Sequence, residues 1–225
     1  MTKKFISTIT CLCVIAACGT AFAQKGEKIM SGPYKGPMGP MMAPEAPAAA
    51  PFYSNLVVDN CVPGQMYSTA NGFFILGPNN CFAAGSTQWI AYPFVSAKAG
   101  TVRQVQLAIT NDTGICTPTT SKFTVQIYDD LNCNGTPSNP LGTAVVATSA
   151  AAPPALALAN FARAGVTLTA ATTYWVVVTT STAATQMGTT AVWWEANANV
   201  QGFNLNDGNG WITAPLGGAG GFSVQ

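Results

Sequence analysis

The sequence predicts an all-β protein, an antiparallel β-sandwich of the jelly-roll kind that follows a disordered N-terminal segment. In runs such as 104–109 and 122–128, apolar residues alternate with polar or small ones, which is the period of a strand with one buried face. Many short strands with turns between them favour a sandwich or jelly roll. Turn dipeptides that end in glycine separate the runs, at residues 71–72, 134–135, 207–208 and 209–210.

Residues 1–23 are expected to be a signal peptide. Two early lysines give a positively charged start, and the uncharged, mostly apolar run 5–17 is short for a spanning helix. The run 21–23 (Ala-Phe-Ala) places small residues where a signal peptidase reads them, so cleavage before Gln24 is expected. The protein is then exported.

A rival processing site lies within the same segment. The run 15–18 (Ile-Ala-Ala-Cys) resembles a bacterial lipobox, in which Cys18 is lipidated and becomes the new N-terminus. A lipid on Cys18 would hold the protein at the cell surface, whereas cleavage before Gln24 would release it. No later segment is long and apolar enough to cross a bilayer, so no transmembrane segment is expected in the mature chain.

The segment 24–51 is rich in Gly, Pro, Met and Ala. This composition cannot bury a core, so we expect a disordered or polyproline-like linker. Residues 52–225 are enough for one sizeable core and are expected to form the β-sandwich domain.

Within this domain, the run 174–178 (Tyr-Trp-Val-Val-Val) is apolar at every position, as expected of a central strand covered on both faces. The stretch 150–160 has a helical composition, but Pro153 and Pro154 break it. Further strands are predicted at 72–76, 88–95, 143–148, 166–169, 173–181 and 190–197.

The 7 cysteines become an even set once the signal peptide is removed. In an oxidising compartment, four cysteines predict two disulfides, among Cys61, Cys81, Cys116 and Cys133. Three connectivities are open. Short spacing favours Cys61–Cys81, which leaves Cys116–Cys133 as the second pair although a predicted strand separates them. Without C-x-x-C spacing or histidine, a zinc site is not expected.

The composition excludes several functional classes. The chain has 0 histidines, which excludes Ser-His-Asp and Cys-His catalysis. Only 8% of residues are charged and no basic patch is present, so no nucleic-acid partner is expected. The triplet Asp112-Thr113-Gly114 matches that of aspartic proteases, but one copy is better interpreted as a turn. We therefore expect no catalytic residues.

One run is rich in oxygen ligands. Asp129, Asp130, Asn132 and Asn134 resemble the opening of a calcium loop, with a glycine directly after. The bidentate acid expected at the twelfth position is missing, because Leu141 stands there. No cofactor is expected apart from a structural calcium ion bound by this run, and a metal-free Asx-rich hairpin loop is the alternative.

The tryptophans are candidates for ligand binding. Trp193 and Trp194 are neighbours on a predicted strand, so they point to opposite faces. One is expected in the core, and the other faces outward or lies under a loop. An exposed aromatic platform on a β-sandwich suits stacking on sugar rings, by analogy, and core packing is the alternative for each indole. The residues considered to join this platform are Trp89, Trp211, Tyr92 and Tyr67.

Three parts of the sequence carry a family resemblance. They are the strand 122–130 with the following 135–137 (Gly-Thr-Pro) and 141–143 (Leu-Gly-Thr), the segment 165–178 with its Thr-Thr-Tyr-Trp, and the later pairs 193–194 (Trp-Trp) and 210–211 (Gly-Trp). Together they are similar to bacterial exported domains of the choice-of-anchor R type, over about residues 88–224. The resemblance implies one β-sandwich with varied surface-anchoring tails, and it supplies no catalytic residues. This chain lacks the C-terminal sorting tail and inserts 112–121, so a lipid anchor or free secretion is expected.

These observations lead to one expected function and two alternatives. The expected function is a non-catalytic exported domain that binds glycan or another surface polymer. The first alternative is a purely structural component of the cell surface or matrix. The second is a glycan hydrolase, which would need two carboxylates about 5–10 Å apart. The candidates for that pair are Asp129, Asp130, Glu195 and Asp207.

Overall fold

The structure is a computed structural model that describes residues 50–56, 65–78, 80, 87–111, 121–131, 133–180, 190–200, 203–214 and 218–225. The expected signal peptide, Cys18 and all but the last residues of the 24–51 linker lie outside these ranges, as does the triplet 112–114. The regular elements within the described ranges are strands. This part of the chain contains no helix with the length and hydrophobicity that crossing a membrane requires.

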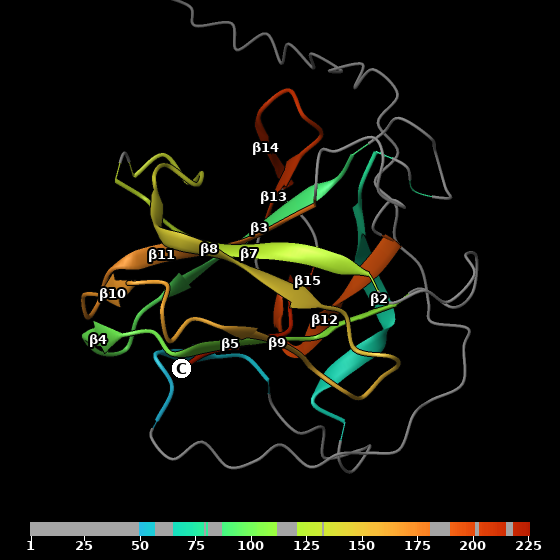
Figure 1. Ribbon diagram of the computed structural model, residues 1–225, viewed down its shortest axis with the longest axis horizontal. Coiled ribbons are helices and arrows are strands. Elements are labelled where there is room, and N and C mark those ends of the chain that lie inside the picture. Colours follow the sequence, from blue (N-terminus) through green and yellow to red (C-terminus); the bar gives the residue numbers. More distant parts are fainter. Residues whose placement is uncertain are drawn as a thin grey trace, which may run out of the picture.

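The strands form several sheets, and all named pairings are antiparallel (Figure 1). The largest has six strands, in the order β14 (Trp211–Ala214), β13 (Phe203–Asn206), β3 (Trp89–Val95), β11 (Thr173–Thr179), β7 (Lys122–Asp129) and β8 (Pro140–Thr148). A four-stranded sheet has the order β1 (Tyr53–Ser54), β16 (Phe222–Val224), β5 (Gln104–Leu107) and β9 (Ala157–Asn160). A third sheet joins β15 (Gly218–Gly220), β12 (Thr190–Val200) and β2 (Tyr67–Leu76), with β6 (Ile109–Asn111) paired to β12, and β10 (Thr167–Leu168) pairs with β4 (Gly100–Thr101).

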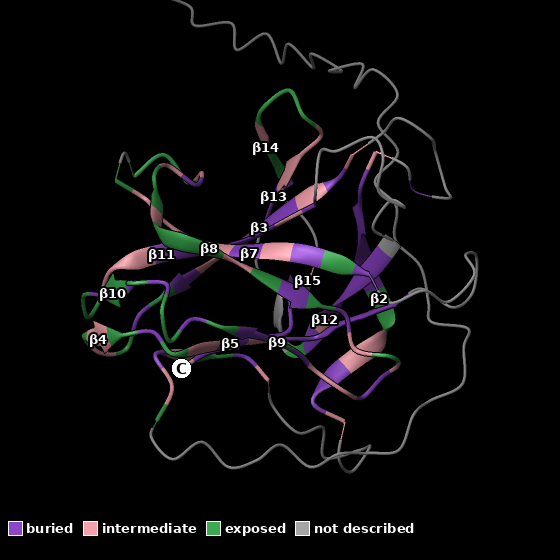
Figure 2. Ribbon diagram, viewed as in Figure 1, coloured by how far each residue is buried: buried purple, intermediate pink, exposed green. Residues whose placement is uncertain are grey.

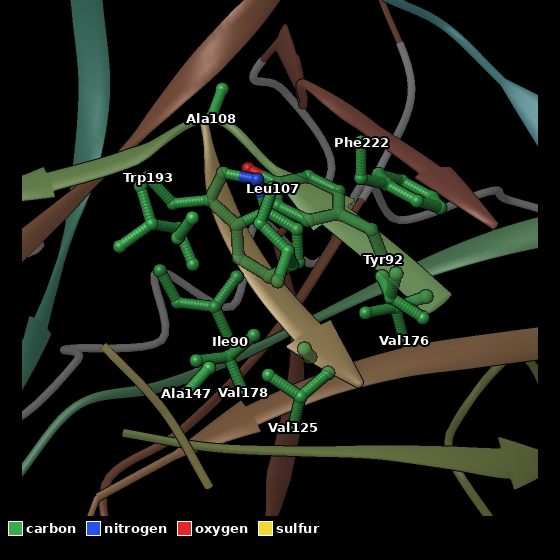
Figure 3. Close-up of a cluster of buried hydrophobic side chains, with 14 of the residues drawn as sticks. Ile90, Tyr92, Leu107, Ala108, Val125, Ala147, Val176, Val178, Trp193 and Phe222 are labelled. Atoms are coloured by element: carbon green, nitrogen blue, oxygen red, sulfur yellow. The ribbon is translucent and has the colours of Figure 1, made fainter. Parts of the chain in front are cut away.

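The sheets pack on one shared core. Val125 and Val176 of the six-stranded sheet belong to the same buried cluster as Leu107 and Phe222 of the four-stranded sheet (Figure 3). Figure 1 shows β7, β8 and β11 running above β5 and β9. β5, β7 and β9 alternate buried with more exposed residues, because successive side chains along a strand point to opposite faces. The predicted all-β antiparallel sandwich is therefore confirmed.

The strand predicted at 104–109 is divided at Ala108. β5 pairs with β16 and β9, whereas β6 begins one residue later and pairs with β12. The Ala108 amide donates to the carbonyl of Gly221 over 2.8 Å, and its carbonyl accepts from the Trp194 amide over 2.9 Å. One continuous segment thereby links two sheets, which its alternating pattern did not reveal.

The central position predicted for 174–178 is confirmed, because β11 lies between β3 and β7. Val176 and Val178 face the main core. Trp175 and Val177 face the other side, where they form a second, smaller buried cluster with Ala91 of β3. We call this side of the six-stranded sheet the outer face. Figure 2 shows β8, at the sheet edge, as largely exposed and β3 as largely buried.

Candidate functional site

Trp193 and Trp194 are both buried, with exposed fractions of 0% and 1%. Neither of them faces outward, so core packing, the alternative given for each indole, is confirmed for both, and their assignment to an exposed platform is wrong. The reason is that both faces of β12 are covered. Trp193 packs edge-on against Tyr92 with ring centroids 4.8 Å apart, and Trp194 Nε1 donates to Thr110 Oγ1 over 2.8 Å. Tyr92 and Tyr67 are also fully buried.

Trp193 belongs to the main core, and Figure 3 shows it in the same cluster as Tyr92, Leu107 and Phe222. Its Nε1 donates to the carbonyl of Gly221 over 3.1 Å. Burial raises the pKa of the Tyr92 phenol well above its ordinary value, and the nearby Glu195 carboxylate raises it further. This region holds the sandwich together and offers no aromatic face to a ligand.

Trp89 and Trp211 lie on the outer face and are partly exposed. Asn206 of β13 pairs with Trp89 on one side and with Trp211 on the other, so the three side chains leave the sheet in the same direction. Trp89 Nε1 donates to Thr180 Oγ1 over 3.2 Å, which restrains that indole. These are the two predicted binding residues that the structure brings to one surface.

Trp175 and Tyr128 extend this aromatic surface. They pair directly across β11 and β7, and Tyr128 and Trp211 both pack against the outer cluster that contains Trp175. We call Trp89, Tyr128, Trp175 and Trp211 the aromatic platform. Sequence reasoning missed the platform role of Trp175 and Tyr128. The available signal was their position in the strand, because each alternates with a core residue on its own strand.

The loop 130–139, which joins β7 to β8, crosses the outer face. We call it the β7–β8 loop, and all of it is described except Asn132. Asn204 Nδ2 of β13 donates to the carbonyl of Gly135 in this loop over 2.8 Å. β11 and β3 lie between β7 and β13 in the sheet. The loop must therefore pass over them to reach Asn204, which accounts for the burial of Trp175, 4% exposed.

Three polar atoms around this loop are buried without a hydrogen-bond partner among the described residues: Asp130 Oδ1, Trp175 Nε1 and Asn204 Oδ1. Asn204 itself has an exposed fraction of 0%. An unsatisfied buried polar group costs about 1–3 kcal/mol, and most buried polar atoms in folded proteins are paired. The three atoms come from different parts of the six-stranded sheet, since Asp130 follows β7, Trp175 lies on β11 and Asn204 lies on β13.

Two residues of the predicted calcium run accept hydrogen bonds from nearby backbone amides. The Asp129 carboxylate accepts from the backbone amide of Asn139 over 2.8 Å and so closes the base of the β7–β8 loop. Asn134 Oδ1 accepts from the amide of Thr136 over 3.1 Å. Of the remaining two, Asp130 has one unpartnered oxygen and Asn132 lies outside the described residues. No cluster of three or more His, Cys, Asp or Glu side chains suited to a metal occurs in the described part of the chain.

The remaining predicted residues are dispersed. Cys133 is an exposed free thiol in the β7–β8 loop, and Cys61, Cys81 and Cys116 lie outside the described residues, so the disulfides stay a prediction. Glu195 on β12 accepts from the amide of Gly218 over 3.1 Å, and Asp207 in the β13–β14 turn accepts from the amide of Asn209 over 2.8 Å. Each of these two carboxylates thus accepts a hydrogen bond from a backbone amide, which is a structural role.

Neither the protein-family models nor the curated proteins give a match to the chain. The outer face is therefore the feature of this chain that points to a function.

Proposed function

We propose that this protein is a non-catalytic exported module that binds a glycan on the outer face of its six-stranded sheet. The aromatic platform is the observation that carries the proposal. Its two partly exposed indoles, Trp89 and Trp211, stand on either side of Asn206. A flat aromatic ring packs against the apolar C–H face of a sugar, and a few polar groups beside it fix the orientation.

The export of the chain and its family are part of the same proposal. A charged start, an apolar run and an Ala-Phe-Ala site support a signal peptide of residues 1–23, with Cys18 as the lipid-bearing residue if processing follows the lipobox. Membership of the choice-of-anchor R type and disulfides among the four later cysteines belong here too. The intact mass of the mature protein tests processing, lipidation and disulfide content together.

The binding test uses the mature protein in affinity electrophoresis through a panel of soluble neutral and acidic polysaccharides. We expect retardation by at least one neutral polymer. Trp211→Ala should weaken binding about ten-fold, because stacking on one indole is lost. Ile212→Ala is the matched control, since Ile212 is the next residue on β14, 44% exposed, and points to the opposite side of the sheet.

The outcomes separate the candidate functions. If the wild-type protein binds no polysaccharide in the panel, the proposal is wrong and the structural alternative is preferred. If it binds and also releases reducing sugar from the polymer, the hydrolase alternative replaces the non-catalytic one. If Trp211→Ala and Ile212→Ala weaken binding equally, the binding surface is not the outer face.

A further inference from the structure

One residue from each strand of the six-stranded sheet joins a continuous row on the outer face. We call this row the strip, and in strand order from β14 to β8 it consists of Trp211, Asn206, Trp89, Thr179, Thr124 and Val146. Direct pairing sets every step except that from Trp89 to Thr179, which follows from the adjacent pair of Ile90 with Val178. Residues paired across neighbouring strands point to the same face, and each of the six is partly or fully exposed.

The strip begins where the cover of the outer face ends. One row further along the strands lie Asn204, Ala91 and Val177, and each of these is at most 1% exposed. The β7–β8 loop reaches over this part of the sheet to bond with Asn204. The strip therefore runs beside the covered rows and across the strands. At about 4.8 Å between neighbouring strands, its six positions span roughly 24 Å.

One end of the strip is aromatic. Trp211 and Trp89 lie two strands apart, and Asn206 stands between them. Asn206 Oδ1 accepts from the Gly208 amide over 2.7 Å, which restrains the side chain. Its Nδ2 has no acceptor among the described residues, so two N–H donors lie between the indoles for a ligand to use.

The other end of the strip carries hydroxyl groups. Thr179 and Thr124 are direct neighbours on β11 and β7, and both belong to the partly exposed row. A hydroxyl group both donates and accepts hydrogen bonds. The strip thus passes from stacking surfaces and an amide to a pair of hydroxyls, and none of its six residues is charged.

A linear sugar polymer matches this order of groups. A pyranose unit in an extended chain is about as long as the spacing between neighbouring strands, so indoles two strands apart can stack on rings two units apart. The ring hydroxyls of such a chain can bond with the amide and the threonine hydroxyls. A neutral chain suits the strip better than an acidic one, because no residue of the strip would pair with a carboxylate.

We propose, resting on the proposed function, that the glycan is a linear neutral polysaccharide that lies along the strip, across the strands, so that the site engages several units of one chain. The indole end then holds short oligosaccharides by stacking. The threonine end adds contacts only when the ligand is long enough to reach it, so affinity depends on chain length.

The test is titration calorimetry of the mature protein with oligosaccharides of two, four and six units from the neutral polymer that it binds. We expect affinity to rise with each increase in length. Thr124→Val keeps the volume and removes a hydroxyl at the end far from Trp211. It should weaken six-unit binding about five-fold, the value of one hydrogen bond, and leave two-unit binding unchanged. Trp211→Ala should weaken binding of both.

The matched control is Thr167→Val, which makes the same change at an exposed position of β10, outside the six-stranded sheet. It should bind every oligosaccharide as the wild type does. Valine favours strands at least as well as threonine, so Thr124→Val should also unfold at the same urea concentration as the wild type. A lower midpoint would give Thr124 a role in the fold and overturn its place in the site.

The remaining outcomes separate the strip from the proposed function. Equal wild-type affinity for two and six units, or equal effects of Thr124→Val on both, would overturn the strip. If Trp211→Ala still weakened binding, the proposed function would stand. Tighter binding of a polyuronate than of any neutral polymer would overturn the neutral ligand. Failure of the wild-type protein to bind any polymer would remove the proposed function itself.

Discussion

Asn204 donates a 2.8 Å hydrogen bond from its side-chain amide to the carbonyl of Gly135, a residue 69 positions earlier in the chain. The bond joins the middle of the β7–β8 loop to a strand that lies beyond two others in the sheet. Gly135 has φ +72°, and a Cβ there would meet no atom within 4 Å. Glycine therefore suits this position because of its left-handed backbone conformation and not because of a close neighbour. The β7–β8 loop thus reaches across the outer face as far as the side chain of Asn204.

Replacing that side chain should release the loop. We expect Asn204→Ala to lower the free energy of unfolding by about 1 kcal/mol, the net value of one hydrogen bond. Amide hydrogen exchange should speed up in peptides that contain residues 133–139. Asn206→Ala is the control, since Asn206 lies on the same face of β13 and its side-chain oxygen serves only the nearby amide of Gly208 among the contacts described for it. Equal exchange in the two variants would contradict the bridging role of Asn204.

A second prediction contrasts two glycines with similar backbone angles. Gly142 has φ +60° and Gly165 has φ +71°. A Cβ on Gly142 would overlap the carbonyl of Ala164, whereas one on Gly165 would meet nothing within 4 Å. Gly142→Ala should therefore cost about 2–4 kcal/mol through strain and overlap together, and Gly165→Ala about 1–2 kcal/mol through strain alone. Urea unfolding measures both, and a Gly165→Ala cost equal to that of Gly142→Ala would show that overlap is relieved at no cost.

A third prediction concerns the buried partner of Trp194. Thr110 Oγ1 accepts from Trp194 Nε1, and both residues are buried. Thr110→Val keeps the volume but leaves the indole N–H unpaired, which should cost about 1–3 kcal/mol. Thr110→Ser keeps the acceptor and loses one methyl group, so about 1 kcal/mol is expected. Chemical denaturation measures both variants. A larger loss of stability in Thr110→Ser than in Thr110→Val would show that the methyl group matters more than the hydrogen bond.

Strands whose sequence has a clear local pattern were predicted well. The runs predicted at 88–95 and 173–181 are β3 (Trp89–Val95) and β11 (Thr173–Thr179), because long stretches of β-branched and aromatic residues specify a strand by themselves. The turn at 207–208 was also indicated, and it joins β13 to β14. β13 and β14, the strands beside that turn, were not predicted, because each has 4 residues, which are too few to establish a period.

The site was harder to predict, because it depends on which strands become neighbours. Trp89 and Trp211 were selected for being aromatic, and their shared surface follows only from the pairing of both with Asn206. The burial of both Trp193 and Trp194 was hard to predict for the same reason. Alternation correctly placed them on opposite faces, but it could not show that β12 is covered on both.

The last prediction is the response of the core to alkaline pH. Burial raises the pKa of Tyr92 well above 10.0, and the negative charge of Glu195 adds to the effect. In the unfolded chain the phenol loses its proton near pH 10, while the folded protein retains it. The unfolded state then binds fewer protons than the folded state, so the free energy of unfolding must fall as the pH rises above 10.

Urea midpoints at pH 8, 10 and 11 measure this fall. Tyr92→Phe has no phenol at this position to titrate, so its midpoint should decline less steeply than that of the wild type over the same interval. Its stability at pH 8 should be only slightly lower, because the hydroxyl's hydrogen bond to the Gly218 carbonyl is long, at 3.3 Å. An equally steep decline in the variant would show that other groups cause the alkaline sensitivity. Burial also raises the pKa of the half-buried Tyr128, so Tyr128→Phe would be the next variant to measure.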